Sequence, residues 1–170
     1  MPDLQTEIPA VPVLVPLAAV LLLAAWLTMR DRLLPAVAGA LYLTGVVAVT
    51  LLPLQIATGL YANQVPWYEK ASYIPIITID LRTFVLNIVM LLPFGFLLPM
   101  LRRIDSVKQI AWLSLAFSAT VELIQFATNV LVSSGRTPDV NDLLANTLGG
   151  VLGFLAWRTA RRALKPAMSS

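Results

Sequence analysis

The chain contains long runs of uncharged, apolar residues that a small soluble protein could not bury. The first runs from residue 8 to 29 and the second from 33 to 54. At about 1.5 Å of rise per residue, either helix would cross a hydrocarbon core about 30 Å thick. Hydrophobic residues make up 58% of the 170 residues and charged residues only 12%, against about 25% in soluble domains. Because lipid tolerates such a surface, the sequence predicts an integral membrane protein.

Three further segments share this apolar character, so we expect five crossings of the membrane. The predicted transmembrane helices are residues 8–29, 33–54, 82–101, 109–132 and 140–157. Residues 55–80 contain several aromatic residues, which prefer the membrane–water interface. We expect an outer loop there, either a plain connector or a lid over a site. The predicted fold class is an all-α, polytopic transmembrane helix bundle that forms a single domain over residues 1–170.

Lys and Arg are distributed unequally between the two predicted sides of the membrane. Two follow the first helix, three follow the third and four lie in the C-terminal tail, whereas the opposite flanks hold only Lys70, Arg82 and Arg136. Because cytoplasmic loops carry the excess of Lys and Arg, we predict that the N-terminus lies outside and the C-terminus in the cytoplasm. The same rule accounts for the isoelectric point near 9.6, so no nucleic-acid partner is expected.

Polar residues within the predicted helices fall on shared faces. In the fourth helix, an arc of about 80°, at about 100° per residue, contains Ser114, Ser118, Glu122, Gln125 and Asn129. Polar groups at bilayer depth are costly and usually face a bundle interior or a wet cavity. The outer ends of the third and fifth helices add further polar side chains. The sequence therefore predicts an outward-facing ligand-binding pocket made of Arg82, Asn87, Glu122, Gln125, Arg136, Asp139, Asp142 and Asn146.

The charged residues at the predicted mouth of this pocket also have structural interpretations. Asp139 and Asp142 fall in the first turn of a helix, where carboxylates cap free N–H groups and offset the helix dipole. Arg82 and Arg136 could anchor helix ends by extending their charged groups towards water. Capping and anchoring therefore remain alternatives to ligand binding for these four residues.

The deeper polar residues differ in how well packing alone explains them. Gln125 and Asn146 could form hydrogen bonds between helices without any further role. A lone carboxylate at the depth of Glu122 needs an Arg partner, a proton or a ligand. Glu122 is therefore the strongest single candidate for a functional role.

Small residues in two helices indicate close helix packing. Ala145, Gly149 and Gly153 recur every four residues, a spacing that lets transmembrane helices approach closely. In the third helix, Pro93 with Gly95 predicts a kink. We therefore assign Gly149, Gly153, Pro93 and Gly95 to helix packing.

The amino-acid types present limit the chemistry. The chain has no Cys and no His, which excludes thiol nucleophiles, serine–histidine triads and histidine-based zinc sites. No cofactor and no metal are expected. The alternative is Mg²⁺ held by the oxygens of Glu122, Asp139 and Asp142.

Three ordered blocks resemble the VanZ-like family of bacterial integral membrane proteins. They are RTFVLNIVMLLPFGFLLP at residues 82–99, SATVELIQ at 118–125 and GRTPDVNDLLANTLGGVLG at 135–153. The resemblance covers roughly residues 41–157. It implies a multi-pass protein of the bacterial plasma membrane with a role in the cell envelope. The family's namesake is linked to low-level resistance to the glycopeptide teicoplanin.

Three classes of function fit these observations. In the first, which we favour, the pocket binds the headgroup of an envelope lipid or cell-wall precursor and lowers susceptibility to teicoplanin-type antibiotics. In the second, the protein is a membrane enzyme that acts on a phosphate-bearing lipid with carboxylate-bound Mg²⁺. In the third, the polar groups serve only structure and assembly. A through-path for transport is not expected, because the inner half of the bundle is almost purely apolar.

Overall fold

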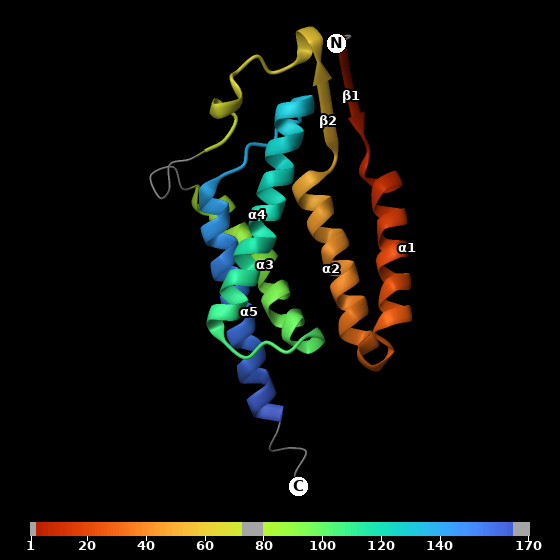
Figure 1. Cartoon of the computed structure of the whole chain (residues 1–170), viewed down its shortest axis with the longest axis vertical. Helices are drawn as coiled ribbons and strands as arrows, with labels where there is room; N and C mark the ends of the chain where they lie inside the picture. Colours follow the sequence, from red (N-terminus) through yellow and green to blue (C-terminus); the bar gives the residue numbers. More distant parts are fainter. Residues whose placement is uncertain (1–2, 73–79, 165–170) are drawn as a thin grey trace.

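The computed structural model describes residues 3–72 and 80–164 and is mostly helical. The described chain contains five α-helices that run along the long axis of the molecule (Figure 1). They are α1 (Ala10–Thr28), α2 (Leu33–Leu51), α3 (Leu81–Leu101), α4 (Val107–Val132) and α5 (Val140–Leu164). α5 makes its most extensive contact with α3 and a smaller one with α4, while α1 packs on α2. The helical bundle expected from the sequence is therefore present.

Four helices in the described part of the chain are long and apolar enough to cross a membrane. They are α1, α2 with the short 3₁₀ turn that precedes it, α3 and α4. α5 is long enough, with 25 residues, but Asn141, Asp142, Asn146 and its glycines dilute the apolar character of its first half. The fifth crossing and the orientation in the membrane stay predictions.

Six helix boundaries differ from those expected: α1 spans Ala10–Thr28 rather than 8–29, α3 begins one residue early at Leu81, and three further ends also move. α2 ends at Leu51 rather than residue 54, because Pro53 disfavours helical backbone at Leu52, which is extended with φ −115° and ψ 154°. α4 begins at Val107, two residues early, since the Ser106 hydroxyl caps it by accepting a hydrogen bond from the Gln109 N–H at 3.1 Å. α5 continues beyond residue 157 to Leu164.

A two-stranded antiparallel sheet extends the hairpin of α1 and α2, and the all-α prediction missed it. β1 (Leu4–Ile8) pairs with β2 (Leu54–Thr58), with Leu4 opposite Thr58 and Ile8 opposite Leu54. The sheet projects past the helices at the end that carries the N-terminus (Figure 1). We call this end of the molecule the sheet end. The opposite end is called the basic end and includes Arg30, Arg32, Arg102, Arg103, Arg158, Arg161 and Arg162.

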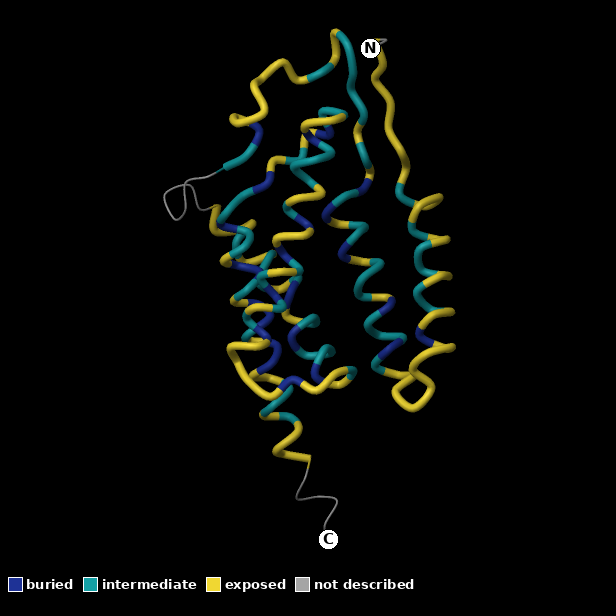
Figure 2. Tube along the Cα trace, viewed as in Figure 1, coloured by how far each residue is buried: buried dark blue, intermediate teal, exposed yellow. Residues whose placement is uncertain are grey.

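The buried residues lie mainly among α3, α4 and α5, whereas α1 is exposed along most of its length (Figure 2). Leu91, Ile110 and Phe154 are almost fully buried, and the rings of Phe94 and Phe117 stack with centroids 4.9 Å apart. Many large apolar side chains are exposed instead. An apolar outer surface is expected where lipid is the solvent.

The contact between α3 and α5 depends on glycine. A Cβ atom at Gly149 would overlap the carbonyl oxygen of Ile88, and one at Gly153 would overlap that of Leu92. A Cβ atom at Gly95 would overlap the backbone of Gly150 in the same way. The two backbones therefore touch without intervening side chains. α3 continues as one helix through Pro93, and the kink expected there stays a prediction.

Candidate functional site

Glu122 and the start of α5 form the centre of the candidate site. A Glu122 carboxylate oxygen accepts a hydrogen bond from the Asp139 N–H at 3.1 Å. The Asp139 carboxylate caps α5 by accepting from the Asn141 N–H at 2.8 Å and from the Asn141 side chain at 2.9 Å. Asp142 lies in the first turn of this helix, close enough to interact electrostatically with both carboxylates. The structure thus brings Glu122, Asp139 and Asp142 together at the sheet end.

A polar pocket opens beside this carboxylate cluster. Its volume is about 160 Å³, and it is lined by Asp80, Thr83, Phe84, Thr137, Asp139, Asn141 and Asp142. Asp80 caps α3 by accepting from the Thr83 hydroxyl at 2.7 Å and the Arg82 N–H at 3.1 Å. These hydrogen bonds hold the pKa of Asp80 below its ordinary value, so the carboxylate stays charged into the acidic range. The sequence offered a signal for Asp80, because an Asp with a Thr three residues later is typical of a helix start, but we did not predict Asp80 as a site residue.

A second hollow, the apolar groove, is lined by residues of α4, of α5 and of the outer loop, and it shares Asp139 with the polar pocket. Its volume is about 460 Å³. The groove is lined by Trp67, Ala71, Ser72, Ala119, Glu122, Leu123, Phe126, Pro138, Asp139, Val140 and Leu143. Glu122 and Asp139 are its only acidic lining residues in the described part of the chain. The groove therefore combines a mostly apolar wall with the two carboxylates of Glu122 and Asp139.

The outer loop reaches this groove. After β2 the chain arches from the sheet towards the start of α5 (Figure 1). There, the Ser72 N–H donates to the Pro138 carbonyl at 2.9 Å, and the Val140 N–H donates to the Ser72 carbonyl at 3.2 Å. Trp67, Ala71 and Ser72 line the groove. Residues 67–72 thus partly cover the groove, while residues 73–79 of the predicted outer loop lie outside the described residues.

Gln125 and Arg136 point away from the carboxylates, towards the end of α2. The Gln125 side chain donates to the Thr50 carbonyl at 3.0 Å, and the Arg136 guanidinium donates to the Leu52 carbonyl at 3.0 Å. Arg82 is exposed. Across residues 3–72 and 80–164, no ion pair joins either Arg to a carboxylate. The Glu122 carboxylate therefore does not pair with an Arg in the described residues. It accepts a hydrogen bond from the Asp139 backbone N–H instead.

Within the part of the chain that the structure describes, Asn87, Asn129 and Asn146 each carry a buried polar atom without a hydrogen-bond partner. Asn146 donates to the Ser118 hydroxyl at 2.9 Å, and Asn129 to the Lys70 carbonyl at 3.4 Å, but the side-chain oxygen of each has no partner. The Asn87 amide nitrogen faces Asp142 without reaching normal hydrogen-bond geometry. Unpaired buried polar atoms cost free energy, so these three side chains are not fully explained by the packing of the described residues.

The described acidic residues include those of the alternative Mg²⁺ site that the sequence suggested. Within the described residues, no group of three or more Asp and Glu side chains is placed to hold an ion. The alternative of Mg²⁺ at Glu122, Asp139 and Asp142 gains no support from this arrangement. What the cluster can do is accept hydrogen bonds from hydroxyl, amide or amino groups.

Comparison with known proteins places this architecture in a family. Neither the curated proteins nor the solved structures give a match. A family model described as VanZ/LLP1 matches residues 15–161, which include most of α1 and α5 and everything between them. This match and the four apolar helices fit a multi-pass membrane protein. The chain belongs to the VanZ/LLP1 family.

Proposed function

We propose that this protein binds an amphiphile of the bacterial cell envelope, either a lipid or a lipid-linked cell-wall precursor. The supporting observation is that the apolar groove and the polar pocket share Asp139. An apolar chain in the groove would therefore place its headgroup beside Glu122, Asp139 and Asp142. Ligand sites usually combine apolar walls with a few convergent polar groups.

The charge of the site favours a particular headgroup. Asp80, Asp139 and Asp142 line the polar pocket, whereas Arg136 is bound to the Leu52 carbonyl. Carboxylates accept hydrogen bonds and attract cations. We therefore infer that the headgroup presents hydroxyl, amide or amino groups, as a glycosyl or peptidyl headgroup does. Arg82, which is exposed beside Asp80, remains available to a phosphate at the rim.

The proposal requires the sheet end to face outwards from the plasma membrane. Because the chain has no Cys, a single Cys can be labelled without background. Gln64→Cys at the sheet end should react with a membrane-impermeant maleimide in intact cells, whereas Lys108→Cys at the basic end should react only after lysis. Both positions are exposed. The reverse labelling pattern would contradict the outward orientation.

Filling the apolar groove should block binding. Ala119 lines the groove on α4, so an indole at Ala119→Trp would occupy it. Ala116→Trp is the matched control, since Ala116 is exposed on the same helix and does not line the groove. We expect Ala119→Trp to lower the amount of lipid retained through purification by about ten-fold or more, equal to about 1.4 kcal/mol. Mass spectrometry of the extracted lipids measures this ratio.

The same two variants test the envelope role. Under the proposal, expression of the unaltered protein lowers the susceptibility of a bacterial host to teicoplanin-type glycopeptides, and Ala119→Trp abolishes the effect while Ala116→Trp retains it. Equal lipid retention and equal susceptibility for the two variants would contradict the proposal.

A further inference from the structure

A second candidate site lies at the basic end, away from the proposed amphiphile site. Two cavities of about 260 and 530 Å³ share Asp105, Trp157 and Arg161, so they adjoin. They lie among the turn before α2, the turn between α3 and α4, and the last turns of α5 (Figure 1). We call them together the basic cleft. Its cationic lining residues are Arg32, Arg102, Arg103, Arg158, Arg161 and Arg162.

The basic cleft has a firm apolar floor. Phe154 and Ile104 line it and are only 1% and 5% exposed. The Phe154 and Trp157 rings stack with centroids 5.8 Å apart. A floor of packed rings fixes the shape of the cleft more firmly than flexible side chains would.

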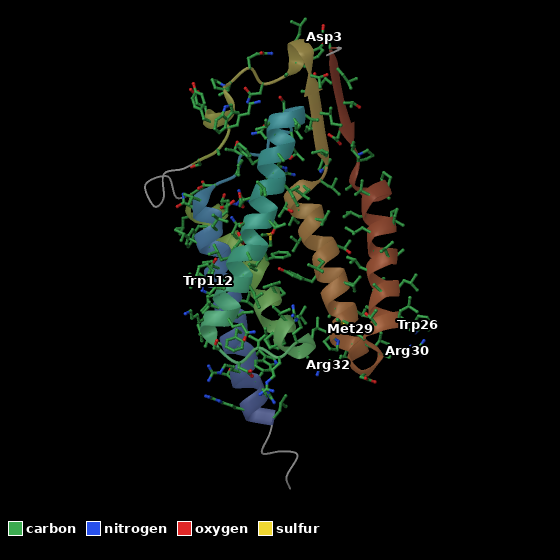
Figure 3. The ribbon with its side chains drawn as sticks, viewed as in Figure 1. Asp3, Trp26, Met29, Arg30, Arg32 and Trp112 are labelled. Carbon is green, nitrogen blue, oxygen red and sulfur yellow. The ribbon has the colours of Figure 1, made fainter. Side chains whose placement is uncertain are left out.

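Contacts with this floor and with helix ends position the guanidinium groups. Arg158 lies 5.7 Å from the Phe154 ring centroid, and Arg161 lies 5.3 Å from that of Trp157. Arg32, labelled in Figure 3, donates to the carbonyls of Met100 and Leu101 at 3.1 and 3.0 Å. Positioned guanidinium groups lose less conformational entropy when they bind an anion.

The charge of the basic cleft is strongly unbalanced. Among the described lining residues, six Arg face one carboxylate, that of Asp105. Asp105 is already paired with Arg103 at 3.1 Å. Arg groups bind phosphate oxygens through paired N–H donors. The expected occupant is therefore a phosphate-bearing anion.

The position of the basic cleft relative to the membrane surface indicates where this anion comes from. The apolar helices α1 and α3 end, and α4 begins, at this end of the bundle. Trp26 and Trp112, which are 49% and 63% exposed, lie towards the same end (Figure 3). Exposed Trp marks the membrane–water interface, and lipid phosphates occupy that level. We infer that the basic cleft binds the phosphate of an anionic phospholipid from the leaflet at this end.

The test counts phosphatidylglycerol bound to the purified full chain. Protein is taken from nanodiscs of mixed phosphatidylcholine and phosphatidylglycerol, and retained lipids are counted by native mass spectrometry. The double variant Arg158→Gln/Arg161→Gln should lose at least about ten-fold in phosphatidylglycerol affinity. The matched control, Arg30→Gln/Lys108→Gln, removes the same charge from the same end outside the cleft and should bind like the unaltered protein. Arg30 also lies over a ring, 4.6 Å from the Trp26 centroid.

A variant expected to gain affinity separates lipid binding from misfolding, because a misfolded protein can lose affinity but does not gain it. Asp105→Asn removes the only carboxylate lining the cleft among the described residues and should raise phosphatidylglycerol affinity by about two- to five-fold. Equal losses in the two double variants would show a general charge effect and overturn the site. Displacement of phosphatidylglycerol by equimolar inorganic phosphate would overturn the lipid assignment in favour of a free phosphate.

Discussion

Gly149→Ala should destabilise the bundle by about 3 kcal/mol, at the upper end of what overpacking costs. The added methyl would meet the backbone carbonyl of Ile88. A flexible side chain could rotate away from such a methyl, but a carbonyl moves only with its helix. α3 and α5 would therefore have to separate, and in a membrane close packing is a main source of helix association.

The same reasoning extends to Gly153 and Gly95, whose added methyl groups would meet the backbones of Leu92 and Gly150. Gly150 differs, because its nearest neighbour is the Ser114 side chain. The Ser114 hydroxyl can rotate, but the Ser114 Cβ, also in the way of the added methyl, moves only with α4, so Gly150→Ala should destabilise the bundle as well.

Gly45→Ala is the matched control, since no atom beyond the neighbouring backbone of its own helix lies within 4 Å of a Cβ placed there. Ala is also the better helix former by about 1 kcal/mol. For a chain of this length, about 3 kcal/mol corresponds to a fall in melting temperature of roughly 6–12 °C. Thermal unfolding of the detergent-purified protein measures the shift. Similar melting temperatures for Gly149→Ala and Gly45→Ala would show that α3 and α5 are not held by backbone contact.

The parts of the structure that depend on helical periodicity were predictable from the sequence. The four-residue spacing of Ala145, Gly149 and Gly153 marks one face of a helix, and that face is buried against α3. The spacing of Ser118 and Glu122 likewise places both on the side of α4 that meets α5. Periodicity identifies a face because helical geometry is the same in every sequence.

Contacts between segments that lie far apart in the sequence were not predictable from the sequence. The strands flanking α1 and α2 are short, and they pair because the two helices bring residues 8 and 54 together. Arg136 was expected at the mouth of the pocket, yet its guanidinium satisfies the Leu52 carbonyl just beyond α2. Carbonyls at helix ends lack intrahelical partners. The sequence shows that such a carbonyl exists but not which side chain will reach it.

A substitution at Glu122 separates the contribution of this side chain to folding from its contribution to ligand binding. Its carboxylate accepts from the Asp139 N–H and also lines the apolar groove. Gln keeps an acceptor oxygen for this N–H and nearly the same shape, but it has no charge. It also removes repulsion from the nearby Asp139 and Asp142 carboxylates. Glu122→Gln should therefore reach the membrane at the normal level and unfold at the same or a higher temperature.

Binding should respond in the opposite direction to stability. We expect Glu122→Gln to weaken binding of a fluorescent glycosyl lipid by about 2 kcal/mol, more than ten-fold in affinity, because hydrogen bonds to charged groups contribute about 1.5–3 kcal/mol. Glu69→Gln is the matched control, an exposed carboxylate near the sheet end that does not line the groove. Fluorescence titration of the purified variants gives both affinities. Equal affinities would remove Glu122 from the site, whereas unfolding of Glu122→Gln would mean that its carboxylate serves the fold, since Gln preserves every contact except the charge.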